Sequence, residues 1–335
     1  MKRIYAILSV AVLTVNVWAQ APQIVKINSE GERENGIAKS YLNDLNIQSD
    51  PAVLFASGFE EGFAGWSAFN NKVSEIISHP DSSFSGNNVL KTTATRGKNT
   101  GGDVDYKIKP EQTQIYLRFY TKLDRNTVSP HHFVKIRAIT EGASTSAGQK
   151  PLGDKAFWTG IEPLANNTWN FYTYWHEMHS SQSWNGASDG RPNPYYGNVF
   201  TVPGQTPFKK GEWICVEAMV KANTPGQYDG EQAFWINGEK IGHWKAGEPL
   251  GAWRGDKFVI NYGDNPQPFE GFNWRTSEDV KINQIKLQWY ISDEHMIKKN
   301  ATQDANSVFF DNVVVSTKYI GPMYDANGPI LSKNK

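Results

Sequence analysis

The segment FYTYWHEMH, residues 171–179, holds tyrosines and histidines at a spacing that suits acid–base chemistry. On a regular strand, alternate side chains point to opposite faces, so Tyr174 and His176 project the same way, about 7 Å apart. Tyrosine and histidine can serve as proton donor and acceptor in one reaction. We predict that Tyr174 and His176 form a general acid and base; the alternative is that both are packing partners on a half-exposed sheet.

A second chemical pattern is cationic. In HHFVKIRAI, residues 131–139, alternation assigns His132 to the core face and leaves Lys135 and Arg137 on the opposite face. We predict that these two cations bind an anionic group, although a charged strand face can also be merely solvated. The outward faces of other strands and the long irregular segment 179–211 add candidate ligand contacts: Arg118, Tyr120, His131, Lys221, Asn223, Gln288, Tyr290 and Trp184.

The elements that must position these residues are short β-type runs. Segments such as IYLRFYTKLD and KINQIKLQWYIS are separated by clusters of Gly, Pro, Asn and Asp. Only SDEHMIKKNA has room for a turn or two of helix, so the pattern predicts an all-β sandwich or barrel. The pair Asn237-Gly238 predicts a tight hairpin turn, and Cys215 inside WICVEAMV is expected to be a buried, inert side chain.

The chain divides into four expected parts. Residues 1–19 have a basic start, an apolar run and small residues near Ala19, which together are typical of a cleaved signal peptide. We therefore expect a secreted or periplasmic protein. Residues 20–51 are predicted to be an amino-terminal leader or arm, 52–325 a single domain and 326–335 a carboxy-terminal tail.

Net charge limits the possible partners. The 34 basic residues balance the 34 acidic ones, so charge gives no reason to expect nucleic acid or an anionic membrane as a partner. The apolar run near the start is too short to span a bilayer stably. We expect a monomer with no membrane span and no organic cofactor.

Three segments together resemble a known group of proteins. GEWICVEAMVKANTPGQYDGEQAFWINGEKI, IYLRFYTKLD and VFFDNVVVSTKYIGP are similar to segments of polysaccharide-lyase-like proteins of the alginate and glucuronan lyase type. The resemblance covers roughly residues 52–322. It implies a concanavalin A-like jelly roll, that is, an all-β sandwich of two antiparallel sheets. These motifs are mostly structural and support the fold better than the activity.

The resemblance also implies an activity. A polysaccharide lyase cleaves a uronate polymer by β-elimination, for which it must neutralise the sugar carboxylate, remove the C5 proton and protonate the departing O4. The outward-facing Lys, Arg, His and Tyr side chains include the residue types that these tasks need. The expected function is therefore binding, and cleavage by elimination, of an acidic polysaccharide.

Jelly rolls of this type often hold a structural Ca²⁺, and the resemblance implies ligands for one here. Glu60, Ser85, Asn88 and Asp311 match the arrangement of an acid on the opening strand, oxygens in the next turn and an acid on the closing strand. All four offer the hard oxygen donors that Ca²⁺ prefers. The alternative is that they are ordinary turn and strand-edge residues.

Two other functions remain open. The first is a non-catalytic carbohydrate-binding or lectin-like module built on the same aromatic residues. The second is a glycoside hydrolase, for which Glu162, Glu177 and Glu217 are the candidate carboxylates. A hydrolase is less favoured, because no strand carries two acids at the separation that such enzymes require.

Overall fold

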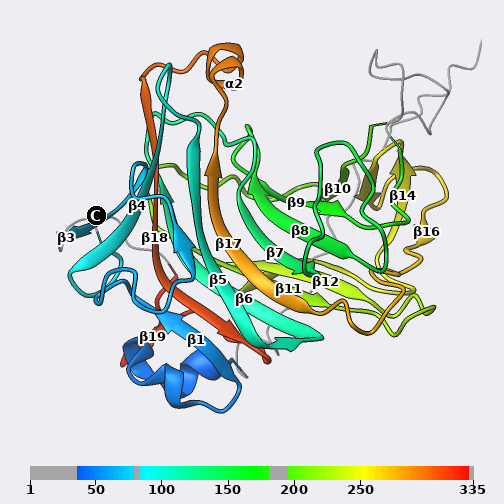
Figure 1. Ribbon diagram of the computed structural model, residues 1–335, viewed down its shortest axis with the longest axis horizontal. Helices are drawn as coiled ribbons and strands as arrows, with labels where there is room; N and C mark the ends of the chain where they lie inside the picture. The colour runs from blue at the N-terminus through cyan, green and yellow to red at the C-terminus, as the bar shows by residue number, and fades with distance from the viewer. Residues whose placement is uncertain (1–35, 79–82, 181–194, 332–335) are drawn as a thin grey trace, which may run out of the picture.

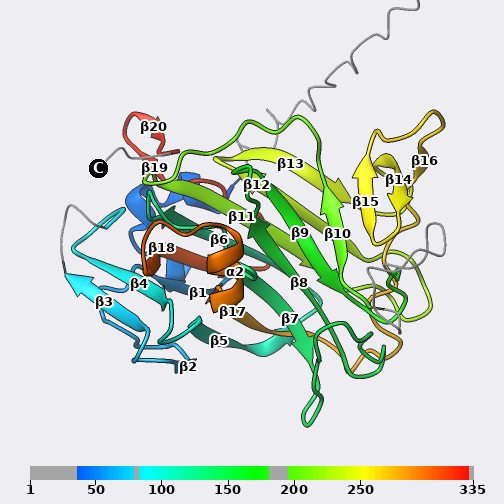
Figure 2. The same cartoon turned by 90° about the horizontal axis from the view of Figure 1, so that it is seen from above.

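The computed structural model describes residues 36–78, 83–180 and 195–331. The predicted signal peptide and Trp184 lie outside these ranges. Two large sheets pack face to face (Figures 1 and 2), and β19 (Tyr324–Asp325) and β20 (Gly328–Pro329) form a separate two-stranded hairpin. The protein is therefore an all-β jelly-roll sandwich, as predicted.

The first sheet has the strand order β13-β12-β11-β6-β18-β4-β3, with β1 paired to β18. Its members are β1 (Val53–Ser57), β3 (Ser74–Ser78), β4 (Asn88–Thr95), β6 (Gln114–Leu123), β11 (Ile214–Lys221), β12 (Glu231–Ile236), β13 (Glu239–Trp244) and β18 (Ala305–Ser316).

The second sheet has the order β16-β14-β15-β10-β9-β8-β7-β17-β5-β2. Among its described strands, every neighbouring pair is antiparallel except β10 and β15. The members are β2 (Ala68–Phe69), β5 (Gly101–Gln112), β7 (Val134–Ile139), β8 (Ala156–Pro163), β9 (Trp169–Tyr174), β10 (Asn198–Thr201), β14 (Leu250–Arg254), β15 (Lys257–Ile260), β16 (Gln267–Pro268) and β17 (Ile282–Tyr290).

The core lies between the two sheets and follows the predicted alternation. Leu117 and Phe119 of β6 face Ile136 of β7 and Leu287 of β17 across one continuous apolar cluster, and all four are essentially buried. Their neighbours in β7 and β17 point to the opposite face of the second sheet. Burial of one such large side chain contributes about 2 kcal/mol, so truncating Phe119 would cost a substantial part of the stability.

Short local features also match the sequence. Asn237 and Gly238 join β12 to β13 with φ angles of 51° and 74°, which is the tight turn predicted there. A short helix, α2 (Asp293–Lys298), begins where the Ser292 hydroxyl accepts a hydrogen bond from the backbone N–H of His295. In the described residues, none of the helices combines the length and the apolar character needed to cross a bilayer.

The described part of the predicted arm is packed against the first sheet. Three 3₁₀ turns, η1 (Ile37–Ser40), η2 (Leu42–Asp44) and η3 (Ile47–Ser49), lie beside β1 and β19 in both views (Figures 1 and 2). Ala38 and Ile47 are buried there against Val314 and Ile320. Residues 36–51 of the arm therefore lie on the outward side of the first sheet and not on that of the second.

Candidate functional site

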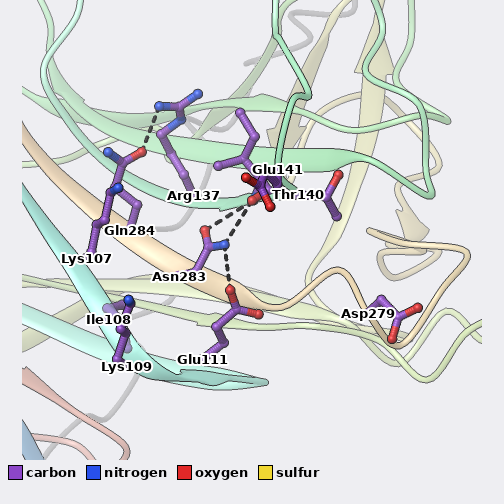
Figure 3. Close-up of a pocket in the computed structure, with 11 residues that line it drawn as sticks. Lys107, Ile108, Lys109, Glu111, Arg137, Thr140, Glu141, Asp279, Asn283 and Gln284 are labelled. Atoms are coloured by element: carbon purple, nitrogen blue, oxygen red, sulfur yellow. Dashed lines mark hydrogen bonds between the residues drawn. The ribbon is translucent and has the colours of Figure 1, made fainter.

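The outward side of the second sheet carries a groove formed by three adjoining cavities. The central cavity, about 430 Å³, lies over β17, β7, β8 and β9. It shares Arg137 with a cavity of about 650 Å³ that we call the Asn283 cavity (Figure 3). It shares His131, His132 and Tyr172 with a third, of about 370 Å³, that we call the Lys257 cavity. Because β7 alone spans roughly 17 Å, the groove is long enough for several linked sugar rings.

Lys135 is the most unusual group in the central cavity. Its Nζ lies 4.2 Å from the centre of the Trp158 ring, and it forms no ion pair with the described residues. Burial lowers its pKa to about 8, although the nearby Glu162 carboxylate opposes this shift. A large share of Lys135 is therefore neutral in mildly alkaline solution, where an amine can accept a proton.

Two tyrosines of β9 face the same cavity. The Tyr174 hydroxyl donates to the carbonyl of Tyr196 at 2.6 Å and accepts the backbone N–H of Gly148 at 3.2 Å. Its bond of 3.1 Å with the Tyr172 hydroxyl must then be donated by Tyr172, because a phenol has a single proton. Tyr174 is thus fully occupied in holding two loops, while the Tyr172 hydroxyl can turn towards a ligand.

Burial first, and then the neighbouring Tyr174, raise the pKa of Tyr172 far above its ordinary value. Tyr172 therefore stays protonated and suits the role of a proton donor. Strand alternation places Tyr172 and Tyr174 on one face of β9, so the sequence does carry a signal for Tyr172, although it is not among the predicted site residues.

Arg137 supplies the positive charge next to Lys135. Its Nη1 donates to Gln284 Oε1 at 2.8 Å, the only hydrogen bond of this guanidinium to the described part of the chain. Its remaining donors can bind a carboxylate. Lys286, its neighbour on β17, is held instead by Asp103 at 2.7 Å and Asp105 at 3.1 Å.

Aromatic and imidazole groups form the wall between the central and Lys257 cavities. His132 lies between the rings of Tyr172 and Tyr290, with centroids 5.4 and 5.9 Å away, and its Nδ1 lies 3.0 Å from Glu162 Oε1. Burial and then His132 lower the pKa of His131 to about 4, so His131 is uncharged near neutral pH.

The prediction that His132 faces the core is wrong. Phe133 is the buried residue instead, and both histidines line the groove. The reason is that regular strand geometry begins only at Val134, so alternation does not extend back through the preceding residues.

Six of the predicted site residues meet in the central cavity. They come from β7, β9, β17 and the segment before β7: Lys135, Arg137, Tyr174, His131, Gln288 and Tyr290. Trp158 of β8 and Tyr195 also line it and were not predicted. Gln288 Oε1 is buried with no hydrogen-bond partner in the described residues, so it can accept a bond from a sugar hydroxyl.

His176 is not part of this site. The strand β9 ends at Tyr174, and His176 follows in a turn, beside Gly153 and Thr276 rather than among the residues that line the groove. The predicted couple of Tyr174 and His176 on one strand face is therefore wrong. The buried Trp175 still follows the core face of Phe171 and Thr173, and the turn that begins at His176 ends the alternation.

Arg118 and Tyr120 are also outside the groove, contrary to the prediction. Both lie on β6 of the first sheet and are fully buried under the chain ends. Arg118 forms an ion pair with Asp44 of the arm, and the Tyr120 hydroxyl donates to the carbonyl of Ile330. Alternation identified their outward face correctly but could not tell which sheet the strand joins.

The same correction applies to Lys221 and Asn223 at the end of β11. Lys221 Nζ pairs with Glu231 at 2.8 Å on the first sheet. Asn223 is buried and donates to Asn273 at 2.8 Å. Both side chains hold structure away from the groove.

Of the three glutamates considered for a hydrolase, one reaches the groove. Glu162 lines the Lys257 cavity beside His132. Glu177 is exposed and accepts from Asn273, and Glu217 is buried on the first sheet, where it accepts the backbone N–H groups of Ile320 and Gly321. This set therefore supplies no pair of carboxylates in the groove.

The four predicted calcium ligands gather near the start of β4. Glu60 Oε1 accepts the N–H groups of Asn87 at 2.8 Å and Asn88 at 3.0 Å, and Asp311 Oδ2 accepts those of Phe84 and Ser85. A Cβ at Gly86 would lie 2.1 Å from Glu60 Oε1, and the φ of +60° also favours glycine, so a larger residue here would displace the Glu60 carboxylate. Among the described residues, Glu60 and Asp311 have no basic partner, and such acids with other oxygens nearby suit a hard cation. The described residues contain no group of three or more His, Cys, Asp or Glu side chains that could hold a metal ion.

Comparison with known proteins gives structural matches alone. No protein-family model matches the chain, and no curated protein matches its sequence. The structure is similar to an endo-β-1,4-glucuronan lyase from the fungus Trichoderma reesei, with 18% identity, a TM-score of 0.48 and coverage of 79% of this chain and 96% of that one. It is similar to a PL-14 alginate lyase from Aplysia kurodai, with 11% identity, a TM-score of 0.48 and coverage of 79% of this chain and 99% of that one. It is also similar to an alginate lyase from Chlorella virus, with 14% identity, a TM-score of 0.47 and coverage of 73% of this chain and 89% of that one.

Proposed function

We propose that the protein is an exported polysaccharide lyase that binds an acidic, uronate-containing polysaccharide in the groove and cleaves it by β-elimination. One observation carries the proposal. Lys135, with a lowered pKa and no ion pair in the described residues, shares a cavity with the protonated hydroxyl of Tyr172 and the guanidinium of Arg137. A base, an acid and a carboxylate binder are the three groups that elimination needs.

The step can be written for these groups. Arg137 binds the uronate carboxylate, which makes the C5 proton more acidic. Neutral Lys135 accepts that proton, the C5 electron pair forms the C4=C5 double bond, and the C4–O4 bond breaks. Tyr172 protonates the departing O4 and regains its proton through solvent from the Lys135 ammonium. The products are a new chain end and an unsaturated uronate.

Ultraviolet absorbance of the unsaturated uronate tests the proposal directly. Purified protein incubated with alginate, glucuronan and alternating uronate polymers should generate this absorbance, and Lys135→Met should abolish it. Retention of the polymer in an affinity gel without absorbance would favour a carbohydrate-binding module instead. Reducing ends without absorbance would indicate a hydrolase.

The Glu60 and Asp311 cluster supports a further part of the proposal, a structural Ca²⁺. Glu60, Ser85, Asn88 and Asp311 would hold it, and Gly86 lets the Glu60 carboxylate lie close to the turn that contains Ser85 and Asn88. The ion would offset the repulsion between Glu60 and Asp311, since the charge of Glu60 helps to raise the pKa of Asp311. Its role would be to join these segments rather than to take part in elimination.

A further inference from the structure

The charges along the groove are unevenly distributed. Around the central cavity, three basic side chains, Lys135, Arg137 and Lys286, face one acid, Asp103. Asp103 and Asp105 both contact Lys286, which leaves Lys135 and Arg137 as the cations without an acidic partner at contact distance in the described residues. The centre is therefore suited to one carboxylate and not to a row of them.

The Asn283 cavity lacks this excess of positive charge. Its three basic side chains, Lys107, Lys109 and Arg137, are matched by three acids, and Arg137 also belongs to the central cavity. The acids are Glu111, Glu141 and Asp279; in Figure 3, Glu111 and Glu141 lie on either side of Asn283, and Asp279 stands further away on a separate loop. Glu111 is fixed there by a 3.0 Å hydrogen bond from Asn283 Nδ2. A carboxylate bound beside Asn283 would therefore lie close to the negative charge of Glu111.

The uncharged groups of the same cavity suit sugar hydroxyls. Asn283 and Gln284 provide amides, and Thr140 Oγ1 is buried with no hydrogen-bond partner in the described residues. At the other end, the Lys257 cavity has one lysine and one acid, Glu162, beside apolar Leu164 and Val199. Neither end matches the excess of positive charge at the centre.

We propose that the groove selects a polysaccharide in which the uronate at the centre is flanked by uncharged sugars, and that Glu111, Glu141 and Asp279 exclude a second uronate from the Asn283 cavity. This inference rests on the proposed function. It names the substrate class as an alternating polymer rather than a polymer of uronates alone. The three acids act as specificity residues because they repel a carboxylate that an uncharged sugar lacks.

The experiment compares two polymer types with two proteins. Glucuronan has a uronate in every position, whereas hyaluronan and deacylated gellan separate their uronates by uncharged sugars. For the wild type, kcat/KM and affinity-gel retention should favour an alternating polymer over glucuronan by about tenfold or more. Equal or stronger action on glucuronan would overturn the proposal.

The triple variant Glu111→Gln, Glu141→Gln, Asp279→Asn keeps the size and hydrogen-bonding oxygens of the three side chains. It should raise retention of glucuronan by about three- to tenfold and leave that of the alternating polymer unchanged. The matched control Glu75→Gln, Glu239→Gln, Asp304→Asn removes the same charge from exposed positions outside the groove and should change neither. Equal gains in both triple variants, or no gain in the first, would contradict the assignment.

The two proposals fail in different ways. If no polymer gives an unsaturated product, elimination is wrong, yet the affinity gel still tests the charge preference on the same samples. If glucuronan is cleaved fastest and the triple variant does not improve it, elimination stands and the alternating substrate is wrong. Circular dichroism of each variant establishes that the fold is intact.

Discussion

The hydroxyl of Tyr172 lies 3.1 Å from that of Tyr174 and donates the hydrogen bond between them, because the proton of Tyr174 is already given to the carbonyl of Tyr196. Two tyrosines two residues apart on one strand therefore have different duties. Tyr174 holds the loops that contain Gly148 and Tyr196 in place. Tyr172 needs only to rotate its hydroxyl to present a proton to the cavity.

The first prediction separates these duties. Tyr172→Phe should lower kcat by about a hundredfold or more, since it removes the proton donor, while polymer affinity and melting temperature stay close to wild type. Tyr174→Phe should mainly destabilise the protein, by about 1–3 kcal/mol, because it leaves the N–H of Gly148 and the carbonyl of Tyr196 without their partner. Urea unfolding and initial rates measure both.

His176→Ala is the control for this pair. Because His176 lies outside the groove, its removal should reduce kcat by less than about threefold. If His176→Ala abolished turnover while Tyr172→Phe did not, the roles assigned from the geometry would be wrong.

The sequence predicted the faces of strands well and the membership of sheets poorly. Alternation in β7 and β17 identified Lys135, Arg137, Gln288 and Tyr290 as residues that share an outward face, and they do meet in one cavity. The same reasoning failed for Arg118, because both sheets of a sandwich have an outward face and periodicity does not say which of them a strand joins.

Strand ends were the second source of error. His132 and His176 lie just beyond β7 and β9, where the period of two no longer holds. The hydrogen bonds of the Tyr174 hydroxyl could not be derived from the sequence, since its partners Gly148 and Tyr196 come from distant loops.

The second prediction concerns pH. A base must be neutral to accept a proton, and the pKa of Lys135 lies at about 8, so kcat/KM should rise as pH increases through about 8 and then level off. Tyr172 keeps its proton across this range, because burial raises its pKa. Initial rates from pH 6 to 10 give the profile. If kcat/KM rose near pH 4 instead, the base would be a carboxylate, and the role of Lys135 would be wrong.

The third prediction follows from the same burial and concerns stability. The folded protein lowers the pKa of Lys135 from 10.5 to about 8, so the unfolded chain binds more protons between these values and stability rises with pH across them. Lys135→Met should therefore stabilise the protein at pH 7, by on the order of 1 kcal/mol after allowing for the lost contact with Trp158. The gain should vanish near pH 10.5.

Urea midpoints at pH 7 and pH 10.5 measure this difference, and Lys107→Met, at an exposed position, is the control that should show no such dependence. The variant that gains stability should at the same time lose turnover. A Lys135→Met protein that is less stable than wild type at pH 7 would mean that burial of the Lys135 ammonium does not destabilise the folded state.

The fourth prediction tests the proposed Ca²⁺. Dialysis against EDTA should lower the melting temperature by about 5 °C, and added Ca²⁺ should restore it, because an ion that binds only the folded state stabilises that state. Glu60→Gln should remove the response without affecting the groove. An unchanged melting temperature in EDTA and in excess Ca²⁺ would mean that the oxygen cluster serves hydrogen bonding alone.

The fifth prediction concerns the ion pair between Arg118 and Asp44, which joins the arm to the first sheet. Both side chains are almost completely buried, and the Arg118 Nε and Nη1 atoms have no hydrogen-bond partner in the described residues. Asp44→Ala should therefore cost about 3–5 kcal/mol, because it leaves the guanidinium buried without its counter-charge. Arg118→Met combined with Asp44→Ala should recover most of that loss, since no charge is then left unpaired.

Urea unfolding of the wild type, both single variants and the double variant gives the coupling energy between Arg118 and Asp44. A double variant no more stable than Asp44→Ala would show that the arm is held by its apolar contacts at Ala38 and Ile47 instead.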